Sequence, residues 1–318
     1  MGSKIKEFTK KNPSWVMYIV LVVLFAVFAV MSPAFLKISN LINVLRQVAM
    51  LGIASIGMTF VLLLGGIDLS IGSQMSVVAV LGGTMMTAWG LHPWISCILC
   101  IVFTSLVGFF NGIVIAKVKM PPLIVTLCSM TVLEGLAYKI SGGIPVFGFP
   151  EGFSVLGQGY VGPIPIPVII MVIVMAIGSV ILNKSYFGRF FYAVGGNEEA
   201  SHLSGIDVTK IKCLVYTLSG TFAGLAGCVL LSRTNSGQPT AGKGFEFDVL
   251  TAIVLGGGSV NGGAGKISNV VAGVLIMGVL ENGMVLVGAS TYDQMIIKGI
   301  VLLLAVGFDF IQRARSKN

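Results

Sequence analysis

Hydrophobic residues occur along this chain in long runs that are separated by short polar or glycine-rich segments. A helix needs about 20 apolar residues to cross a hydrocarbon core about 30 Å thick. The runs do not alternate with period two, as the strands of a membrane barrel would. The pattern predicts an all-α membrane protein with about ten transmembrane helices, near residues 15–32, 41–64, 71–88, 94–116, 122–140, 164–183, 212–231, 247–258, 267–287 and 293–311.

The composition supports a lipid environment for most of the surface. Hydrophobic residues make up 55% of the 318 residues and charged residues only 10%, whereas soluble domains carry about 25% charged residues. Too few polar side chains remain to cover a soluble globule of this length. We therefore predict one transmembrane domain over residues 1–318, with no separate soluble domain.

The positions of the basic residues predict how the chain is oriented. The net charge is +8, but Lys and Arg occur in small groups between apolar runs, where positive charge holds loops in the cytoplasm. A nucleic-acid-binding face would need a soluble surface, so we exclude nucleic acid as a partner. Most of the 20 basic residues fall on the inner side if both termini are cytoplasmic, including Lys4, Lys6, Lys10, Lys11, Arg313, Arg315 and Lys317.

Two connections are long enough to carry a function. Residues 141–165 are predicted outside, where several Gly and Pro residues oppose regular helix. Residues 184–211 are predicted inside and form the most polar stretch of the chain. Within them, Asn197 suits a helix N-cap, Glu198 and Glu199 suit the positive end of the helix dipole, and Gly205 suits the left-handed position after the helix. Such a short helix fits a partner's groove, and it equally fits an ordinary interfacial helix.

Two glycine-rich breaks interrupt the apolar runs in corresponding ways. Residues 64–73 and residues 255–263 both begin with Leu-Gly-Gly and lead back into an apolar run. Matched breaks are typical of transporters that are built from two related halves. Asp68 or Ser70 could cap the helix after the first break, because amides in lipid need a partner. Two unrelated tight turns are the alternative.

Several polar residues inside the predicted spans are candidates for a translocation path. Ionisable side chains are costly in a membrane and are therefore candidates for function, although a neighbouring side chain or water can also satisfy them. By contrast, the pairs Gly108/Gly112 and Gly220/Gly224 predict close helix packing rather than ligand contact. The path candidates are Asn43, Gln47, Asp68, Asn111, Glu134, Glu281 and Asn282.

The sequence carries no recognisable catalytic machinery. Gly262–Lys266 is similar to a phosphate-binding loop, but Ile267 follows the lysine and Val260 occupies the position of the first glycine. His92 and His202 are far apart and lack the spacing of zinc ligands. We therefore predict no catalytic residues, no metal and no cofactor, and we expect any ATP hydrolysis to occur in a partner.

Taken together and in order, ten short stretches resemble one family: the ribose-type sugar permeases of bacterial ABC importers, which also handle xylose, galactose and autoinducer sugars. Each stretch is weak alone, but they extend over most of the chain. They are Gly65–Ser70 with Gly72, Pro122–Leu127, Gly195–Glu198, Leu203–Ile206, Ser219–Gly220, Ala223–Gly227, Gln238–Gly242 with Phe245–Asp248, Leu255–Gly257, Asn282–Gly283 and Gln294–Gly299.

The resemblance implies a multi-pass permease of the bacterial cytoplasmic membrane that imports a monosaccharide. It implies a second permease copy, an extracytoplasmic sugar-binding protein and an ABC ATPase, whose two nucleotide-binding domains are often fused. It also implies that the inner loop contacts the ATPase through Asn197, Glu198, Glu199, His202, Leu203 and Gly205.

Two positions depart from the family pattern. Glu134 stands where members usually have Arg, and Glu281 stands where Asn is common. Both changes add acid inside the membrane, and one hypothesis is that the acids alter the polarity of the channel for a different sugar. Intramembrane acids and paired breaks also fit an ion-coupled secondary transporter of a small polar solute. A membrane-embedded enzyme is a third class, and the sequence offers no catalytic set for it.

Overall fold

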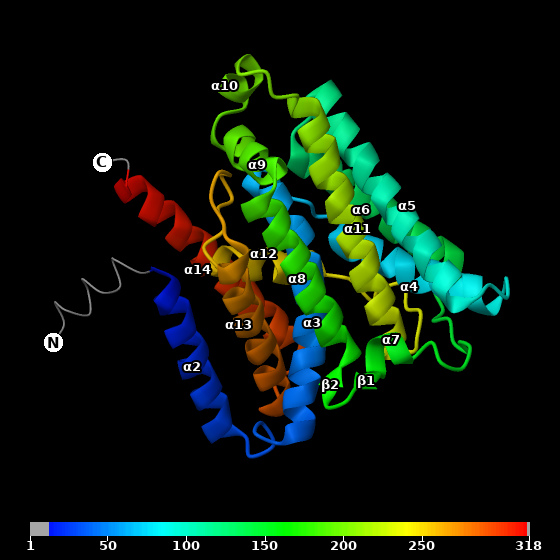
Figure 1. The fold of residues 1–318 in the computed structure, drawn as a ribbon. Coiled ribbons are helices and arrows are strands. Elements are labelled where there is room, and N and C mark those ends of the chain that lie inside the picture. Colours follow the sequence, from blue (N-terminus) through cyan, green and yellow to red (C-terminus); the bar gives the residue numbers. More distant parts are fainter. Residues whose placement is uncertain (1–12, 317–318) are drawn as a thin grey trace.

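The computed structural model describes residues 13–316, with side chains described over residues 17–311, so the basic groups at both termini lie outside the described side chains. Each of the ten predicted spans corresponds to a helix, which confirms the all-α class (Figure 1). These helices are α2 (Pro13–Met31), α3 (Ile38–Leu63), α4 (Ile71–Thr87), α5 (Pro93–Ile113), α6 (Pro122–Ser141), α8 (Ile166–Lys184), α11 (Val208–Thr234), α12 (Phe245–Leu255), α13 (Ile267–Leu286) and α14 (Thr291–Ser316).

Length divides these helices into two groups. Among the described residues, 7 helices are long and apolar enough to cross a membrane by themselves. The shorter ones are the apolar part of α2, Met17–Met31, together with α4, Ile71–Thr87, and the 11-residue α12. The two helices α4 and α12 directly border the predicted glycine breaks, as expected for discontinuous spans.

The two long connections contain more regular structure than the sequence predicted. The predicted external loop holds the one-turn helix α7 (Val155–Gln158) and an antiparallel pair of two-residue strands, β1 (Tyr160–Val161) and β2 (Ile164–Pro165). The predicted inner loop holds two helices rather than one, α9 (Tyr186–Gly196) and α10 (Glu198–Leu203). These two groups lie at opposite ends of the bundle (Figure 1).

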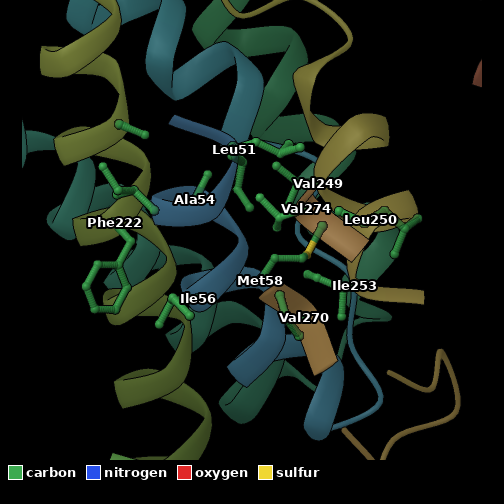
Figure 2. Close-up of a cluster of buried hydrophobic side chains, with 14 of the residues drawn as sticks. Leu51, Ala54, Ile56, Met58, Phe222, Val249, Leu250, Ile253, Val270 and Val274 are labelled. Atoms are coloured by element: carbon green, nitrogen blue, oxygen red, sulfur yellow. The ribbon is translucent and has the colours of Figure 1, made fainter. Parts of the chain in front are cut away.

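The hydrophobic core is built around α3. Of its most apolar window, 83% is buried inside the protein, compared with 0% for α14. A helix that is apolar on all sides is suited to such a central place. Figure 2 shows side chains of α3 between neighbouring helices, with Met58 directed toward α12 and α13 and Phe222 of α11 on the other side.

Close contact between α5 and α11 depends on small residues. A Cβ added at Gly112 would lie 2.7 Å from the Cα of Cys213, and one at Gly108 or Gly220 would strike the backbone of the facing helix. Small residues permit such backbone approach in membranes, where the hydrophobic effect does not drive helices together. The predicted packing role of the two glycine pairs is confirmed.

Candidate functional site

The first glycine break surrounds a fully buried carboxylate. The chain leaves α3 through Gly65, which has a φ of +75°, and enters α4 at Ile71. Between them, Asp68 has no exposed surface. Its Oδ1 accepts hydrogen bonds from the Ser70 amide (3.0 Å) and hydroxyl (2.5 Å), and its Oδ2 accepts one from the Ser219 hydroxyl (2.7 Å). Asp68 thus satisfies an amide at the start of α4, whereas the side chain of Ser70 forms no capping bond.

The hydrogen bonds continue from Ser70 into neighbouring helices. Its hydroxyl accepts from Gln74 Nε2 (2.8 Å) and Asn111 Nδ2 (3.4 Å), and the Ser129 hydroxyl donates to Asn111 Oδ1 (2.5 Å). We call this group the Asp68 cluster, and it comprises Asp68, Ser70, Gln74, Asn111, Ser129 and Ser219. It joins the first break to α4, α5, α6 and α11, and buried polar groups need such partners because burial removes their water.

A second polar group lies on α12, α13 and α14. The ammonium of Lys298 contacts Asp248 Oδ2 at 2.8 Å and Glu281 Oε1 at 2.9 Å. These three side chains are 20%, 13% and 28% exposed, so each retains some access to its surroundings. We call them the ion triad. Lys298 lies in the first third of α14 and balances two acids, because an unpaired charge is costly within a membrane.

The helix α12 begins inside the bundle rather than at its edge. Gly244, at a φ of +82°, precedes it, and Glu246 and Asp248 lie in its first turn, where acids offset the exposed amides. Gly242 donates its amide to the Ser76 hydroxyl of α4 at 2.9 Å, and Glu246 is buried against Gly72. The segment before α12 is therefore fixed against α4.

The remaining path candidates lie on different helices and do not form one group. Asn282 forms a reciprocal amide pair with Asn40, with both bonds at 2.9 Å. Asn43 is exposed and Gln47 is partly buried on α3. Glu134 is partly buried on α6, near enough to Glu246 for their charges to interact.

The structure therefore brings together Asp68 and Asn111 but not the other candidates. Sequence reasoning did not place Ser70, Gln74, Ser129 or Ser219 in the path, although Ser70 was a candidate cap and both Ser70 and Ser219 belong to stretches that resemble the family. It also missed Asp248 and Lys298 as partners of Glu281. The acidic first turn of the short helix α12 was the available signal for Asp248; the signal for Lys298 was a single cation within an apolar run.

The two glycine breaks meet at the end of the bundle that carries α9. The Gly263 amide donates to the Leu63 carbonyl at 2.9 Å, and the Tyr192 hydroxyl of α9 donates to the Gly265 carbonyl at 2.6 Å. Gly195 lies directly against the Leu63 carbonyl, where a Cβ would overlap it. We call this contact the glycine junction. The Gly263 amide is thus engaged within the glycine junction.

The helix α10 is capped as its sequence predicted, and a contact that the sequence did not predict anchors it to α11. The Asn197 side chain accepts from the Ala200 amide at 2.9 Å, and Gly205 has a φ of +85° after the helix. Lys212 of α11 contacts both oxygens of Glu198 at 2.7 and 2.8 Å. Glu199 and His202 are exposed, and Leu203 is 81% exposed. An exposed apolar side chain is therefore presented on a capped helix that Lys212 ties to α11.

Comparison with known proteins gives consistent relatives over nearly the whole chain. A family model described as the permease component of branched-chain amino acid transport systems matches residues 40–306. The chain is similar to a ribose import permease protein of Bacillus subtilis, with 44% identity over 291 residues, or 91% of this chain and 90% of the relative.

Two relatives from Escherichia coli extend this similarity. The chain is 40% identical to a ribose import permease protein over 312 residues, which cover 96% of each chain. It is 41% identical to an L-arabinose transport system permease protein over 302 residues, or 94% of this chain and 91% of the relative. No solved structure matches.

Proposed function

We propose a function from the family to which the chain belongs, the permeases of bacterial ABC importers. In this proposal it is the membrane subunit that carries ribose or a related monosaccharide across the cytoplasmic membrane. The observation that supports a sugar is the identity of 40–44% to relatives named for ribose and L-arabinose, over more than nine-tenths of the chain. Permeases of this family do not hydrolyse ATP themselves, so the energy comes from a partner ATPase.

We propose that the ATPase contacts α10 through Glu199, His202 and Leu203. Movement of α10 passes to α9, with which it shares Asn197 as the boundary residue. From α9 it reaches the glycine junction, where Gly195 and Tyr192 contact both breaks. Asp68 lies within the first break, so a displacement of α10 shifts the helices α4, α5, α6 and α11, which the Asp68 cluster joins.

We assign different roles to the two polar groups. The Asp68 carboxylate is buried and accepts three hydrogen bonds from Ser70 and Ser219, so it holds the first break in position rather than binding sugar in this state. The ion triad is partly exposed and offers both acceptors and a donor, which suit sugar hydroxyl groups. We therefore place the path beside α12 and α14, with the partly buried Glu134 contributing a further acceptor on the side of α6.

The partners and the orientation follow from the same proposal. Residues 141–165 face outward, where a sugar-binding protein delivers its ligand, and residues 184–211 and both termini face the cytoplasm. A second copy of the permease packs against α14, whose apolar window is unburied in the single chain. The domain over residues 1–318 then forms one half of the membrane channel.

Reconstitution tests this function. The permease is placed in vesicles with its ATPase and binding protein, and uptake of radiolabelled ribose, L-arabinose and a disaccharide is measured with ATP enclosed on the ATPase side. We expect uptake of a monosaccharide that requires both ATP and the binding protein. Uptake driven by a sodium or proton gradient without ATP would contradict the proposal and support a secondary transporter.

A further inference from the structure

An apolar crevice separates α5 from α6 along the outer surface of the bundle. Its volume is about 500 Å³. The lining is apolar apart from Ser129 and Cys128, and several lining side chains are strongly exposed, including Leu106, Phe110 and Val132 at 59%, 62% and 68%. No side chain of the described residues fills this space, so a different molecule must occupy it in a bilayer.

The crevice is open because its two walls pack against different neighbours. The helix α5 is held tightly to α11 by Gly108 and Gly112. The helix α6 is held to α4, where Leu133 and Ala137 contact Val77 and Val80. The two helices of this hairpin therefore diverge, and a π-helical turn, η1 (Val114–Val118), connects them with Lys119 in the left-handed conformation at a φ of 59°.

The chemistry at the end of the crevice indicates what occupies it. Val114 and Met120 line the crevice, and Lys117 and Lys119 lie between them in the chain. Both lysines are exposed, and neither forms an ion pair with any acid in the described part of the protein. An apolar crevice that ends at two unpaired cations is complementary to a lipid with apolar chains and an anionic headgroup. Each lysine near a membrane surface strengthens the binding of an anionic lipid about fivefold.

We propose that this crevice binds one anionic phospholipid of the cytoplasmic leaflet, with an acyl chain between α5 and α6 and its phosphate at Lys117 and Lys119. The bound chain fills the gap that glycine-mediated packing leaves, and it supports α6, the helix that carries Ser129 of the Asp68 cluster. The proposal does not depend on the transported solute, and lipid retention measures it without transport.

Native mass spectrometry of the full-length permease tests the proposal. The protein is reconstituted in vesicles of phosphatidylglycerol and phosphatidylethanolamine with matched acyl chains, extracted in detergent, and analysed for retained lipid. We expect one retained phosphatidylglycerol per chain. Val132→Trp fills the crevice and should abolish retention of either lipid, whereas Val102→Trp, at an exposed position of α5 outside the lining, should leave retention unchanged.

A charge variant tests the headgroup separately. In the double variant Lys117→Gln/Lys119→Gln, the preference for phosphatidylglycerol should fall at least tenfold, while some phosphatidylethanolamine remains bound. The control Lys184→Gln/Lys266→Gln removes the same charge from two exposed lysines near the same end of the bundle and should keep the preference. Equal retention of both lipids by the wild type, or retention that Val132→Trp does not change, would overturn the proposal. A second permease copy seated in the crevice, detected as a Cys128–Cys128 cross-link, would also overturn it.

Discussion

At the scale of single residues, charge within the membrane determines what each polar side chain can do. Glu281 was a path candidate as an isolated acid, but Lys298 and Asp248 surround it and make it one member of a neutralising group. Asp68 was a candidate on similar grounds, and its carboxylate is occupied by three hydrogen bonds. The number and kind of partners thus separate a partly accessible triad from a carboxylate that is fully enclosed by its hydrogen-bond donors.

The first prediction concerns the ion triad. Lys298→Met leaves Asp248 and Glu281 as two neighbouring acids without a cation, which should destabilise the protein by about 3 kcal/mol. Thermal unfolding in detergent measures this change. The triple variant Lys298→Met/Asp248→Asn/Glu281→Gln removes both acids with the cation and should recover most of the stability; an equally low melting temperature would show that the charges are not the cause.

The second prediction concerns Asp68. Asp68→Asn replaces an acceptor oxygen by a donor NH₂ group, so at least one hydroxyl or amide of Ser70 or Ser219 loses its partner. We expect a loss of about 1–3 kcal/mol and reduced sugar uptake at unchanged affinity of the binding protein. Ser219→Ala removes only one of the three bonds and should cost less, and a larger effect of Ser219→Ala would contradict this assignment.

At the scale of elements, backbone contact replaces side-chain packing where helices must be very close. The helices α5 and α11 meet along glycines from both sides, and the two breaks meet at Gly263 and Leu63. These contacts fix the central helices but leave α6 and α14 with broad free faces. The elements with free faces are therefore the ones available for lipid, sugar or a second copy.

The α5–α11 contact makes the third prediction. Gly220→Ala places a methyl group against the backbone at Thr104, so the helices must separate and unfolding should occur at a clearly lower temperature, with a loss of about 1–3 kcal/mol. The control is Gly135→Ala on α6, where a Cβ meets nothing within 4 Å. That control should be neutral or slightly stabilising, because Ala favours helix by up to about 1 kcal/mol over Gly.

The helix α10 makes the fourth prediction. Leu203→Glu should abolish co-purification of the ATPase and reduce ATP-driven uptake at least tenfold, because a charge replaces the exposed apolar contact. The melting temperature of the permease alone should not change, since Leu203 is 81% exposed. Leu36→Glu, at a 53% exposed leucine at the opposite end of the bundle, serves as the control. Normal ATPase binding by the Leu203→Glu variant would contradict the proposal that the ATPase contacts α10.

At the scale of the whole molecule, burial is distributed unevenly across the bundle. The centre is formed by α3, α11 and α13, whereas α14 contributes no buried residue in its apolar window. A helix so placed would face lipid or a second subunit, and the ion triad connects it to α12 and α13. This unevenness is the structural basis for proposing a dimer.

The fifth prediction concerns the proposed dimer. In a background with the native cysteines replaced by serine, Leu303→Cys on α14, which is 72% exposed, should form a disulfide between two copies in membranes. Leu99→Cys on α5, which is 41% exposed, should not. Gel mobility without reductant measures both. Cross-linking of both variants, or of the α5 variant alone, would place the interface elsewhere.

The sequence by itself determined the fold class, the ten helices, the two glycine breaks and the cap of α10. These features depend on local patterns: runs of apolar residues that match the membrane thickness, glycines that end helices, and an Asn before two acids. The same local signals did not reveal that residues 184–211 contain two helices: Ser185 precedes α9 and is a suitable N-cap type, but its side chain forms no capping bond.

The tertiary structure alone decided which polar residues meet. Asp68 and Ser219 are 151 positions apart, and Lys298 and Asp248 are 50 apart, so no local pattern relates them. Their contacts result from helix packing, which for Asp68 and Ser219 includes the close approach of α11 to α5 at their glycines. For the same reason the meeting of the two breaks, and the open crevice beside α6, are properties of the packed bundle, whereas the helices themselves are properties of the sequence.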